Sequence, residues 1–499
     1  MKTNTLEFDA QALREKILDL AMRGKLVPQD PNDEPASVLL KKIKAEKEKL
    51  IKEKKIKKSK PLAPISDNEK PFDIPDSWEW VRLGDAANFI GTGMVVPSSQ
   101  QYKDLEDETM IPYFKMNNIG NWNGEFDLTN IVYIKKNEKV DKYLISSDEL
   151  LFNTRNSREL VGKTTVVPTI NKRIVANNNI LRITTFGNIQ TKFLNYILIS
   201  PYGKNLFFNL TTATTNVAAI YQKQLREIMI PLPPLEEQSR IAAKIAQLFA
   251  LLRKVESSTQ QYAKLQTLLK SKVLDLAMRG KLVEQDTHDE PASVLLEKIK
   301  AEKAEIVKEK KIKKSKPLPP ITDEEKPFDI PDSWEWVRLG DVYHFVDYRG
   351  KTPHKISSGI RLITAKNVRN GYIKLEPEEF ISLEEHKERS TRGLINKGDI
   401  FITTEAPMGL VALNNFDEPI ATAQRLITLQ KVSKYQDSSF AAFQMQSSFF
   451  QKELQQKATG STVKGIKASN LKQVLILIPP LAEQRRTVKK ISQVLKLLK

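Results

Sequence analysis

The feature that most constrains this chain is one long segment that occurs twice. Residues 17–85 and 273–341 align without a gap at a constant offset of 256, and 57 of the 69 aligned positions are identical. The residues that follow each copy, 86–210 and 342–455, share little. A repeated frame that carries two unlike inserts predicts a protein that reads two different things at a fixed separation.

A second, shorter repeat closes each insert. Residues 231–240 match residues 477–486 at an offset of 246, and both contain a Pro-Pro pair. Because Pro is tolerated at the start of a helix but not inside one, helices are expected to begin near Leu235 and Leu481. Apolar residues then recur in heptad steps. The pattern predicts a helix from Leu235 to about Lys281, roughly 70 Å long at 1.5 Å per residue.

The two chain ends fit the same frame. Residues 8–26 align with residues 264–282, and residues 481–499 align with residues 235–253. The ends therefore rebuild one further copy of the long helix without its middle. Packing on that helix would bury their apolar seam, whereas two separate beads on a string would leave the end helices nothing to bury. We expect a pseudo-twofold arrangement with the terminal helices packed on the central ones.

Each insert has the pattern of a mixed α/β domain, with short β-rich runs between Asn, Gly and Asp turn signals. The runs are Trp80–Leu83, Ile131–Ile134, Lys163–Val167, Ile180–Thr185, Ile360–Thr364, Ile400–Thr404 and Gln424–Leu429. Trp78 and Trp80 alternate, as do Trp334 and Trp336, which predicts that each pair faces one side of a strand as a core anchor. Base stacking is the alternative for these pairs. The predicted fold class is α+β.

Composition excludes several kinds of chemistry. The chain has 499 residues and no cysteine, which rules out disulfides, thiolate metal sites, Fe–S clusters and cysteine nucleophiles. The first ten residues are too polar for a signal peptide, and no apolar run is long enough to span a membrane. A reducing, cytoplasmic location is expected.

The net charge of +18 is placed unevenly. Residues 41–60 hold 11 Lys and 3 Glu, and residues 297–316 hold 9 Lys and 4 Glu. A basic chain suggests a polyanionic partner, although Lys/Glu-rich helices are also typical of solvated faces. Our hypothesis is that these two runs help to hold partner subunits or the phosphates of a nucleic acid.

The usual signatures of catalysis are missing. The four histidines, His288, His344, His354 and His386, have no metal-site spacing. Two Gly-Lys-Thr tripeptides lack the upstream Gly of a phosphate-binding loop. Residues 89–93 imitate the first motif of S-adenosylmethionine methyltransferases, but the Asn-Pro-Pro-Tyr-like or Asp-Pro-Pro-Tyr-like tetrapeptide of amino-group methylation is absent. We therefore expect a chain without enzyme activity, cofactor site or metal site of its own.

The repeated motifs identify a resemblance that covers nearly the whole chain. The motifs that carry it are LDLAMRGKLVPQD (18–30), SWEWVRLGD (77–85), PLPPLEEQ (231–238), their second copies, LFNTRNS (151–157), ITAKNV (363–368) and TGSTVKGI (459–466). With these motifs the chain resembles the specificity subunit of type I restriction–modification enzymes.

The resemblance implies two target-recognition domains held apart by antiparallel conserved helices, each reading one half of a split, asymmetric DNA site. It also implies two modification subunits, which bind S-adenosylmethionine and methylate adenine, and two restriction subunits, which use ATP and Mg²⁺. The expected domains are an N-terminal helical region (1–70), recognition domain 1 (71–234), a central helical region (235–326), recognition domain 2 (327–480) and a C-terminal helix (481–499).

Candidate DNA contacts are clusters of the side chains that bind base edges and phosphates. In the first insert they are Lys115, Asn117, Asn118, Asn153, Arg155, Asn156, Ser157, Arg158, Lys163, Thr214, Thr215 and Asn216. In the second they are Arg349, Lys351, Thr352, Lys366, Asn367, Arg369, Asn370, Glu405, Ser461, Thr462 and Lys464. Any single member is equally typical of a turn or a strand-end cap. Glu405 could accept a hydrogen bond from a cytosine amino group.

Three alternatives stay open at this point. One is an autonomous DNA methyltransferase, and another is a coiled-coil scaffold without a nucleic-acid role. The third is the same recognition architecture in an orphan modification system that lacks a nuclease. The target sequence and its spacer cannot be read from one chain, because loop geometry and indirect readout determine them.

Overall fold

A computed structural model describes residues 8–58, 60–105, 107–187, 189–213, 217–348, 352–390, 393–423, 425–460 and 463–498. The described residues divide into two compact units at the junction of Thr259 and Gln260. We call them the N-terminal unit and the C-terminal unit. The boundary lies inside the 44-residue helix α7 (Leu235–Met278), so each unit contains one part of that helix.

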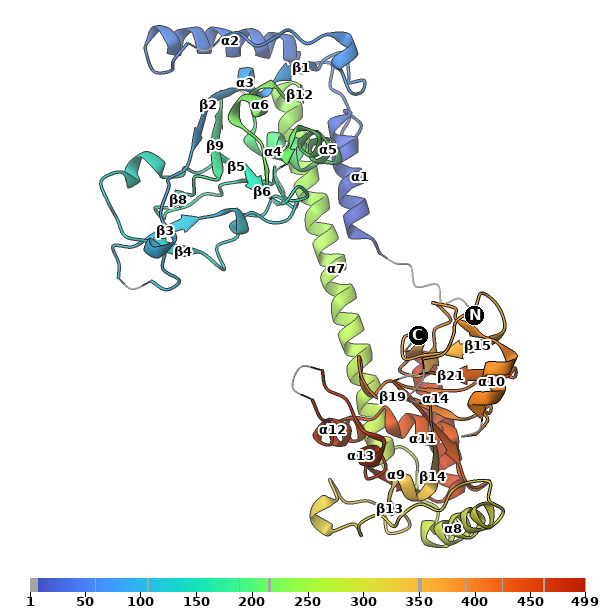
Figure 1. The fold of residues 1–499 in the computed structure, drawn as a ribbon. Coiled ribbons are helices and arrows are strands. Elements are labelled where there is room, and N and C mark those ends of the chain that lie inside the picture. The colour runs from blue at the N-terminus through green and yellow to red at the C-terminus, as the bar shows by residue number, and fades with distance from the viewer. Residues whose placement is uncertain are drawn as a thin grey trace. The chain divides into compact units, whose positions relative to one another are not determined.

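In the N-terminal unit, helix α1 (Ala10–Met22) packs on the first part of α7 (Figure 1). Leu18 of α1 shares a buried core cluster with Ile241 and Ile245 of α7. Arg14 donates to Glu256 at 2.9 Å, so the two helices run antiparallel. The terminal helix therefore buries its apolar seam on the central helix, as the sequence predicts.

The turn after α1 requires glycine. Gly24 has φ +65°, and a Cβ there would lie 2.3 Å from Pro75. The repeated Gly280 has φ +66° and would place a Cβ 2.5 Å from Pro331. Both positions combine a left-handed backbone with a close approach, so no other residue fits without a shift.

The frame of the N-terminal unit continues through α2 (Ala36–Lys52), which buries Leu39 and Ile43 and exposes most of its lysines. A two-stranded base then closes the insert, where β1 (Glu79–Arg82) pairs antiparallel with β12 (Met229–Leu232). The short helix α3 (Leu83–Ala86) follows β1.

The first insert holds one larger antiparallel sheet and two smaller sheets. The larger sheet has the order β2 (Ala87–Thr92), β9 (Ile180–Thr185), β5 (Leu150–Asn153) and β7 (Thr164–Val166). Helices α4 (Thr191–Ile199) and α5 (Pro201–Leu210) share its core. The smaller sheets are β4 (Val132–Ile134), β3 (Ile111–Phe114), β8 (Val175–Ala176), and β10 (Thr212–Ala213), β11 (Ala218–Ala219), β6 (Arg155–Asn156). Helix α6 (Gln222–Glu227) precedes β12.

The C-terminal unit builds the same frame from later segments. It uses α8 (Ala292–Lys308), the strand pair β13 (Glu335–Arg338) and β23 (Leu475–Ile478), α9 (Leu339–Val342) and the terminal helix α14 (Leu481–Leu497). Ile491 of α14 lies in one buried cluster with Val273 and Leu274 of α7. The second terminal helix thus packs on its own part of α7, as expected.

The second insert repeats the sheet layout of the first. Its larger sheet has the order β14 (Tyr343–Asp347), β22 (Leu426–Lys431), β19 (Ile400–Thr403) and β20 (Val411–Leu413). The smaller elements are β18 (Phe380–Ile381), β15 (Ile360–Ile363), β21 (Ile420–Thr422), β16 (Val368–Arg369), β17 (Tyr372–Ile373), α10 (Leu383–Arg389), α11 (Ser438–Met445), α12 (Ser448–Gln456) and α13 (Ala468–Leu471).

The α+β fold class and the long central helix are confirmed, and the helix ends at Met278, three residues before the expected end. The predicted heptad seam is buried at Ile241 and Ile245 and again at Val273, whereas Val255 and Tyr262 in the middle are exposed within their units. The tryptophan pairs are core anchors, with side chains 3% and 9% exposed in each unit. The first of each pair lies just before the strand instead of on it.

Candidate nucleic-acid interface

The two inserts place equivalent residues at the end of their central strands, although their sequences differ. In the first, Thr154 donates its backbone N–H to Asn179 O at 2.8 Å and accepts from Ile220 N at 3.0 Å. In the second, Thr404 donates to Arg425 O at 2.9 Å and accepts from Ile466 N at 2.9 Å. These bonds make positions 154, 179 and 220 equivalent to 404, 425 and 466.

The residue after Thr154 and the residue after Thr404 were both predicted to contact DNA, and they carry opposite charges. Arg155 pairs with Ala219 between β6 and β11, and Glu405 forms the matching bridge with Gly465. Arg155 and Glu405 therefore occupy one and the same place in the two folds. Each stands two residues after the end of its central strand, β5 or β19.

In the N-terminal unit this position borders a hollow of about 250 Å³. Its polar lining comes from four separate segments, and it includes Arg155, Asn178, Asn179, Tyr221 and Gln222. The Arg155 side chain is exposed and Tyr221 is 56% exposed. The lining residues include no acid, so the hollow offers donors, amides and one aromatic ring to a partner.

In the C-terminal unit a hollow of about 260 Å³ lies against the equivalent strand end. Lys355, Lys366, Arg425, Thr352 and Thr364 contribute to its lining. The Lys355 ammonium contacts the Glu379 carboxylate at 2.7 Å, and Arg425 Nε contacts Glu405 Oε1 at 2.8 Å. Three cations thus border this hollow.

The structure separates the predicted contacts into four groups. Exposed are Asn117, Arg155, Arg158, Thr352, Lys366, Asn370 and Lys464, and partly buried are Lys115, Asn156, Ser157, Arg369 and Glu405. Buried are Asn118, Asn153, Lys163 and Asn367. Outside the described residues lie Thr214, Thr215, Asn216, Arg349, Lys351, Ser461 and Thr462.

The buried asparagines close turns. Asn118 Oδ1 accepts from Lys115 N at 2.9 Å, and Asn367 Oδ1 accepts from Thr364 N at 3.0 Å, at equivalent turns after β3 and β15. Asn153 Nδ2 donates to a backbone carbonyl. Because these amides are 0–1% exposed and already bonded, we leave them out of the proposed interface.

Lys163 is also held inside the fold. Its ammonium donates to Ile119 O at 2.8 Å and to Asn121 Oδ1 at 3.1 Å, and the residue is 3% exposed. Burial lowers the pKa of this ammonium. A lysine that ties two loops from within cannot reach a phosphate, and we leave it out as well.

Several exposed or partly buried contacts are held in place by neighbours. Arg158 stacks its guanidinium over the Phe208 ring at 3.9 Å, and Lys115 Nζ donates to Gln101 at 2.9 Å. Arg369 donates to two backbone carbonyls. Such preset side chains lose less conformational entropy on binding than free ones.

Sequence reasoning missed part of the lining of both hollows. Asn178, Asn179, Tyr221, Lys355 and Arg425 line them but stand outside the predicted clusters. The 246-residue offset that matches residues 215–217 with 461–463 continues through residues 219–221. At this offset Ile220 matches Ile466, so the sequence marks the segment around Tyr221 but not Tyr221 itself.

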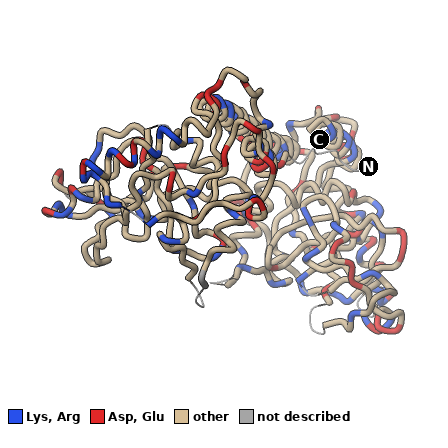
Figure 2. Tube along the Cα trace, turned by 90° about the horizontal axis from the view of Figure 1, so that it is seen from above, with Lys and Arg blue, Asp and Glu red and all other residues tan. Residues whose placement is uncertain are grey.

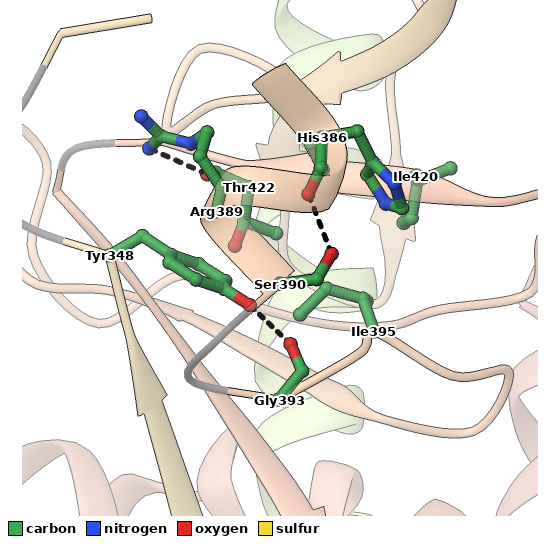
Figure 3. Close-up of a pocket in the computed structure, with 9 residues that line it drawn as sticks. Tyr348, His386, Arg389, Ser390, Gly393, Ile395, Ile420 and Thr422 are labelled. Atoms are coloured by element: carbon green, nitrogen blue, oxygen red, sulfur yellow. Dashed lines mark hydrogen bonds between the residues drawn. The ribbon is translucent and has the colours of Figure 1, made fainter. Parts of the chain in front are cut away.

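A hollow beside α10 has no room for a ligand (Figure 3). Its volume is about 10 Å³, which is close to one water molecule. Tyr348 donates to Gly393 O, Ser390 donates to His386 O at 2.6 Å, and Arg389 donates to Thr422 O at 3.4 Å. The Arg389 bond ties α10 to β21, and the other two bonds hold residues that directly follow β14 and α10, so the hollow is structural.

A buried carboxylate ties three segments of each frame together next to the base of its insert. Glu237 accepts from the indole N–H of Trp78 at 2.8 Å and from Gln29, and Glu483 accepts from Trp334 at 2.8 Å and from Gln285. Burial raises the pKa of both Glu237 and Glu483. We call this duplicated group of glutamate, tryptophan and glutamine the clasp.

The Lys-rich helices α2 and α8 carry their charge outward. Lys47 contacts Asp85 at 2.9 Å, whereas Lys303 in α8 donates to the backbone carbonyls of Gly340 and Asp341. Most other lysines of these helices are exposed. In Figure 2, Lys and Arg alternate with Asp and Glu along many segments of both units.

Comparison with known proteins identifies the family. The family described as "Type I restriction modification DNA specificity domain" matches residues 75–266 and 331–499. The Escherichia coli EcoAI specificity subunit is 33% identical over 98% of this chain and 89% of its own length. The EcoEI specificity subunit of the same organism is 30% identical over the same shares.

A solved structure from work on assembly and conformational transition of the type I R-M system supports the fold. It has a TM-score of 0.55 at 20% identity and covers 86% of this chain and 92% of its own. The chain belongs to the type I restriction–modification specificity subunits, the DNA-recognition component of those enzymes.

The described residues hold neither a metal-binding cluster nor a helix fit to span a membrane. They contain no group of three or more His, Asp or Glu arranged to hold a metal ion. Among them, no helix combines the length and the apolar composition that crossing a membrane requires.

Proposed function

We propose that the two inserts are target-recognition domains that each read one half of a split, asymmetric DNA site. Recognition domain 1 would span residues 71–234 and recognition domain 2 residues 327–480. The helical regions 1–70, 235–326 and 481–499 would form the shared frame. The proposal is supported most by one observation, which is that the unlike inserts on two copies of one frame present opposite charges, Arg155 and Glu405, at equivalent places.

The proposed DNA contacts are the predicted side chains that remain accessible, together with those that line the two hollows. In recognition domain 1 they are Lys115, Asn117, Arg155, Asn156, Ser157, Arg158, Asn178, Asn179 and Tyr221. In recognition domain 2 they are Thr352, Lys355, Lys366, Arg369, Asn370, Glu405, Arg425 and Lys464. Exposed cations, amides and an aromatic ring suit phosphates and base edges. The predicted residues Thr214, Thr215, Asn216, Arg349, Lys351, Ser461 and Thr462 stay candidates from their sequence alone.

We further propose that the repeated frame docks two copies of one modification subunit, which binds S-adenosylmethionine and methylates adenine. Two restriction subunits that use ATP and Mg²⁺ would join them. The two frames repeat the same fold and the same clasp, which suits two equal docking faces. The absence of cysteine fits assembly in a reducing cytoplasm.

The test is a methylation map. The chain would be expressed with its modification subunit in cells that lack adenine methylation, and methylated adenines would be located across the genome. We expect one motif with two unlike halves and a spacer of constant length. Methylation without such a motif, or the same map without this chain, would contradict the proposal.

A further inference from the structure

The equivalent positions at the two strand ends differ in how their side chains are used. In recognition domain 1, Arg155 is exposed and Asn179 lies beside it on the hollow. In recognition domain 2, Glu405 and Arg425 hold the same two positions and contact each other at 2.8 Å. The ion pair of Glu405 and Arg425 thus stands where recognition domain 1 has an arginine and an amide.

Stability does not explain the Glu405–Arg425 pair. The Arg425 side chain is 56% exposed and the Glu405 side chain is 42% exposed, and ion pairs at such exposure contribute little to folding. Arg425 also adopts φ +66°, a left-handed backbone that is uncommon for residues other than glycine. A strained backbone that presents a solvent-exposed charge at the rim of a hollow is typical of a binding position.

The contact leaves a defined set of donors and acceptors. Arg425 Nε faces Glu405 Oε1 in an ion pair, so the two terminal nitrogens of Arg425 can serve as donors and Glu405 Oε2 can serve as an acceptor. In the major groove, guanine presents the acceptors O6 and N7, and its partner cytosine presents the N4 amino donor beside them. The pair is therefore complementary to one C·G base pair.

We propose that Glu405 and Arg425 together read a C·G base pair in the half-site of recognition domain 2. Glu405 accepts from the cytosine N4 amino group, and Arg425 donates to guanine O6 and N7. A T·A pair at that place sets an acceptor against the carboxylate and a donor against the guanidinium. Lys355 and Lys366, on the same hollow, lie where cations would bind the flanking phosphates.

This inference rests on the proposed function, and the experiment separates the two. The full chain would be combined with its modification subunit and S-adenosylmethionine. Methylation rates would be measured on duplexes in which each base pair of the second half-site is changed in turn. We expect one C·G position in that half-site where T·A lowers the rate by about 5- to 150-fold, the range for a good bidentate contact.

The variants assign that discrimination to the pair. Glu405→Gln and Arg425→Gln should each lose most of it, while discrimination in the first half-site stays as in the wild type. Arg425→Lys keeps the charge but loses the planar fork, so it should lose the guanine preference and keep affinity for random DNA. Retained binding of random DNA by that variant also shows that the domain is folded.

Two controls are built into the chain. Lys397→Ala removes another exposed ion pair of the same domain, Lys397–Asp417 at 2.7 Å, which precedes β19 instead of following it. This variant should keep wild-type discrimination. Arg155→Gln should alter the first half-site alone.

The outcomes distinguish the two ideas. If the wild-type complex methylates no split site, the proposed function fails. If it does so and the Glu405 and Arg425 variants keep wild-type preference at every position, the base-pair assignment is wrong and the proposed function stands. A second half-site without any C·G pair would overturn the assignment in the same way.

Discussion

The buried glutamates of the clasp have the same structural role in both units. Glu237 and Glu483 are each 1% exposed, and each accepts hydrogen bonds from an indole and from a side-chain amide. Removing the acceptor leaves the buried indole N–H without a partner, which is more costly than losing one exposed contact. The clasp therefore fastens the tryptophan that precedes each base strand to a helix of the frame, α7 through Glu237 and α14 through Glu483.

We predict that Glu237→Ala lowers the free energy of unfolding by about 1–3 kcal/mol, the cost of a buried donor left unsatisfied. The matched control is Glu236→Ala, the exposed neighbour in the same helical turn, which should cost less than about 1 kcal/mol through the helix dipole. Denaturant unfolding followed by tryptophan fluorescence measures both. An equal loss of unfolding free energy in both variants would show that the buried hydrogen bonds of the clasp add no stability beyond that of an exposed glutamate.

The same residue gives a pH signature. Because burial raises the pKa of Glu237 above its unfolded value, the native state binds the proton more tightly. The stability that follows is fully present below the ordinary glutamate pKa and is lost as pH rises through the raised one. The wild type should therefore lose stability relative to Glu237→Ala on going from acid to neutral pH, and a flat difference would contradict the shift.

At the scale of residues, the sequence predicted the place of side chains that have one usual role. It did not predict the place of side chains that have two. The alternating tryptophans are large and apolar, so burial followed from their type. Asn118 and Asn367 stood among the predicted contacts because an amide suits a base edge as well as a turn. Arg425 was missed because it has no polar cluster around it in the sequence, and only strand pairing brings it to Glu405.

At the scale of elements, the long central helix, the end helices and seven strands of three to six residues were predictable, and the two-residue strands were not. The heptad seam and the Pro-Pro pair before it predicted the long helix. The repeats at offsets of 256 and 246 predicted the end helices. Strands β6, β10 and β11 have two residues each, too few to show a period of two. They nevertheless carry Arg155, so the geometry of the hollow could not be derived from the sequence.

The Lys-rich helices give a prediction at this scale. Lys44, Lys49 and Lys52 of α2 and Lys300 and Lys308 of α8 are exposed. Changing all five to Gln keeps helix propensity and should weaken either assembly with the modification subunit or DNA binding. Each lost phosphate contact lowers the slope of log affinity against log salt by about 0.9.

The control for that experiment is Lys42→Gln with Lys298→Gln. These lysines already contact Glu34 and Glu290 at 2.6 and 2.5 Å, so they are less available to a partner. Titration of DNA at several salt concentrations and size-exclusion chromatography of the complex provide the readouts. Unchanged assembly together with an unchanged salt slope in the five-lysine variant would remove any role for these helices.

At the scale of the whole molecule, each unit holds a complete frame and a complete reader. The insert leaves its frame after α3 or α9 and returns at β12 or β23, in the same register, with Glu79 opposite Leu232 and Glu335 opposite Ile478. Each insert is therefore attached to its frame in the same way, although the two inserts differ in sequence.

We predict that exchange of residues 87–228 for the insert of another specificity subunit changes one half of the methylated motif only. The base strands β1 and β12 stay in place, so the frame and the second reader keep their contacts. Exchange of residues 343–474 should change the other half, and a methylation map reads both results. A change in both halves after either exchange would show that the readers are not independent.

The repeated stretch before each insert also affects how new specificities can arise by genetic exchange. Residues 69–85 and 325–341 are identical, and they end where the insert begins. A genetic crossover within that stretch delivers a whole reader to an unaltered attachment point, so a descendant cell can acquire a new methylation pattern in one event. In the complex that we propose, this one chain directs both methylation and cleavage, so both activities would change their target together.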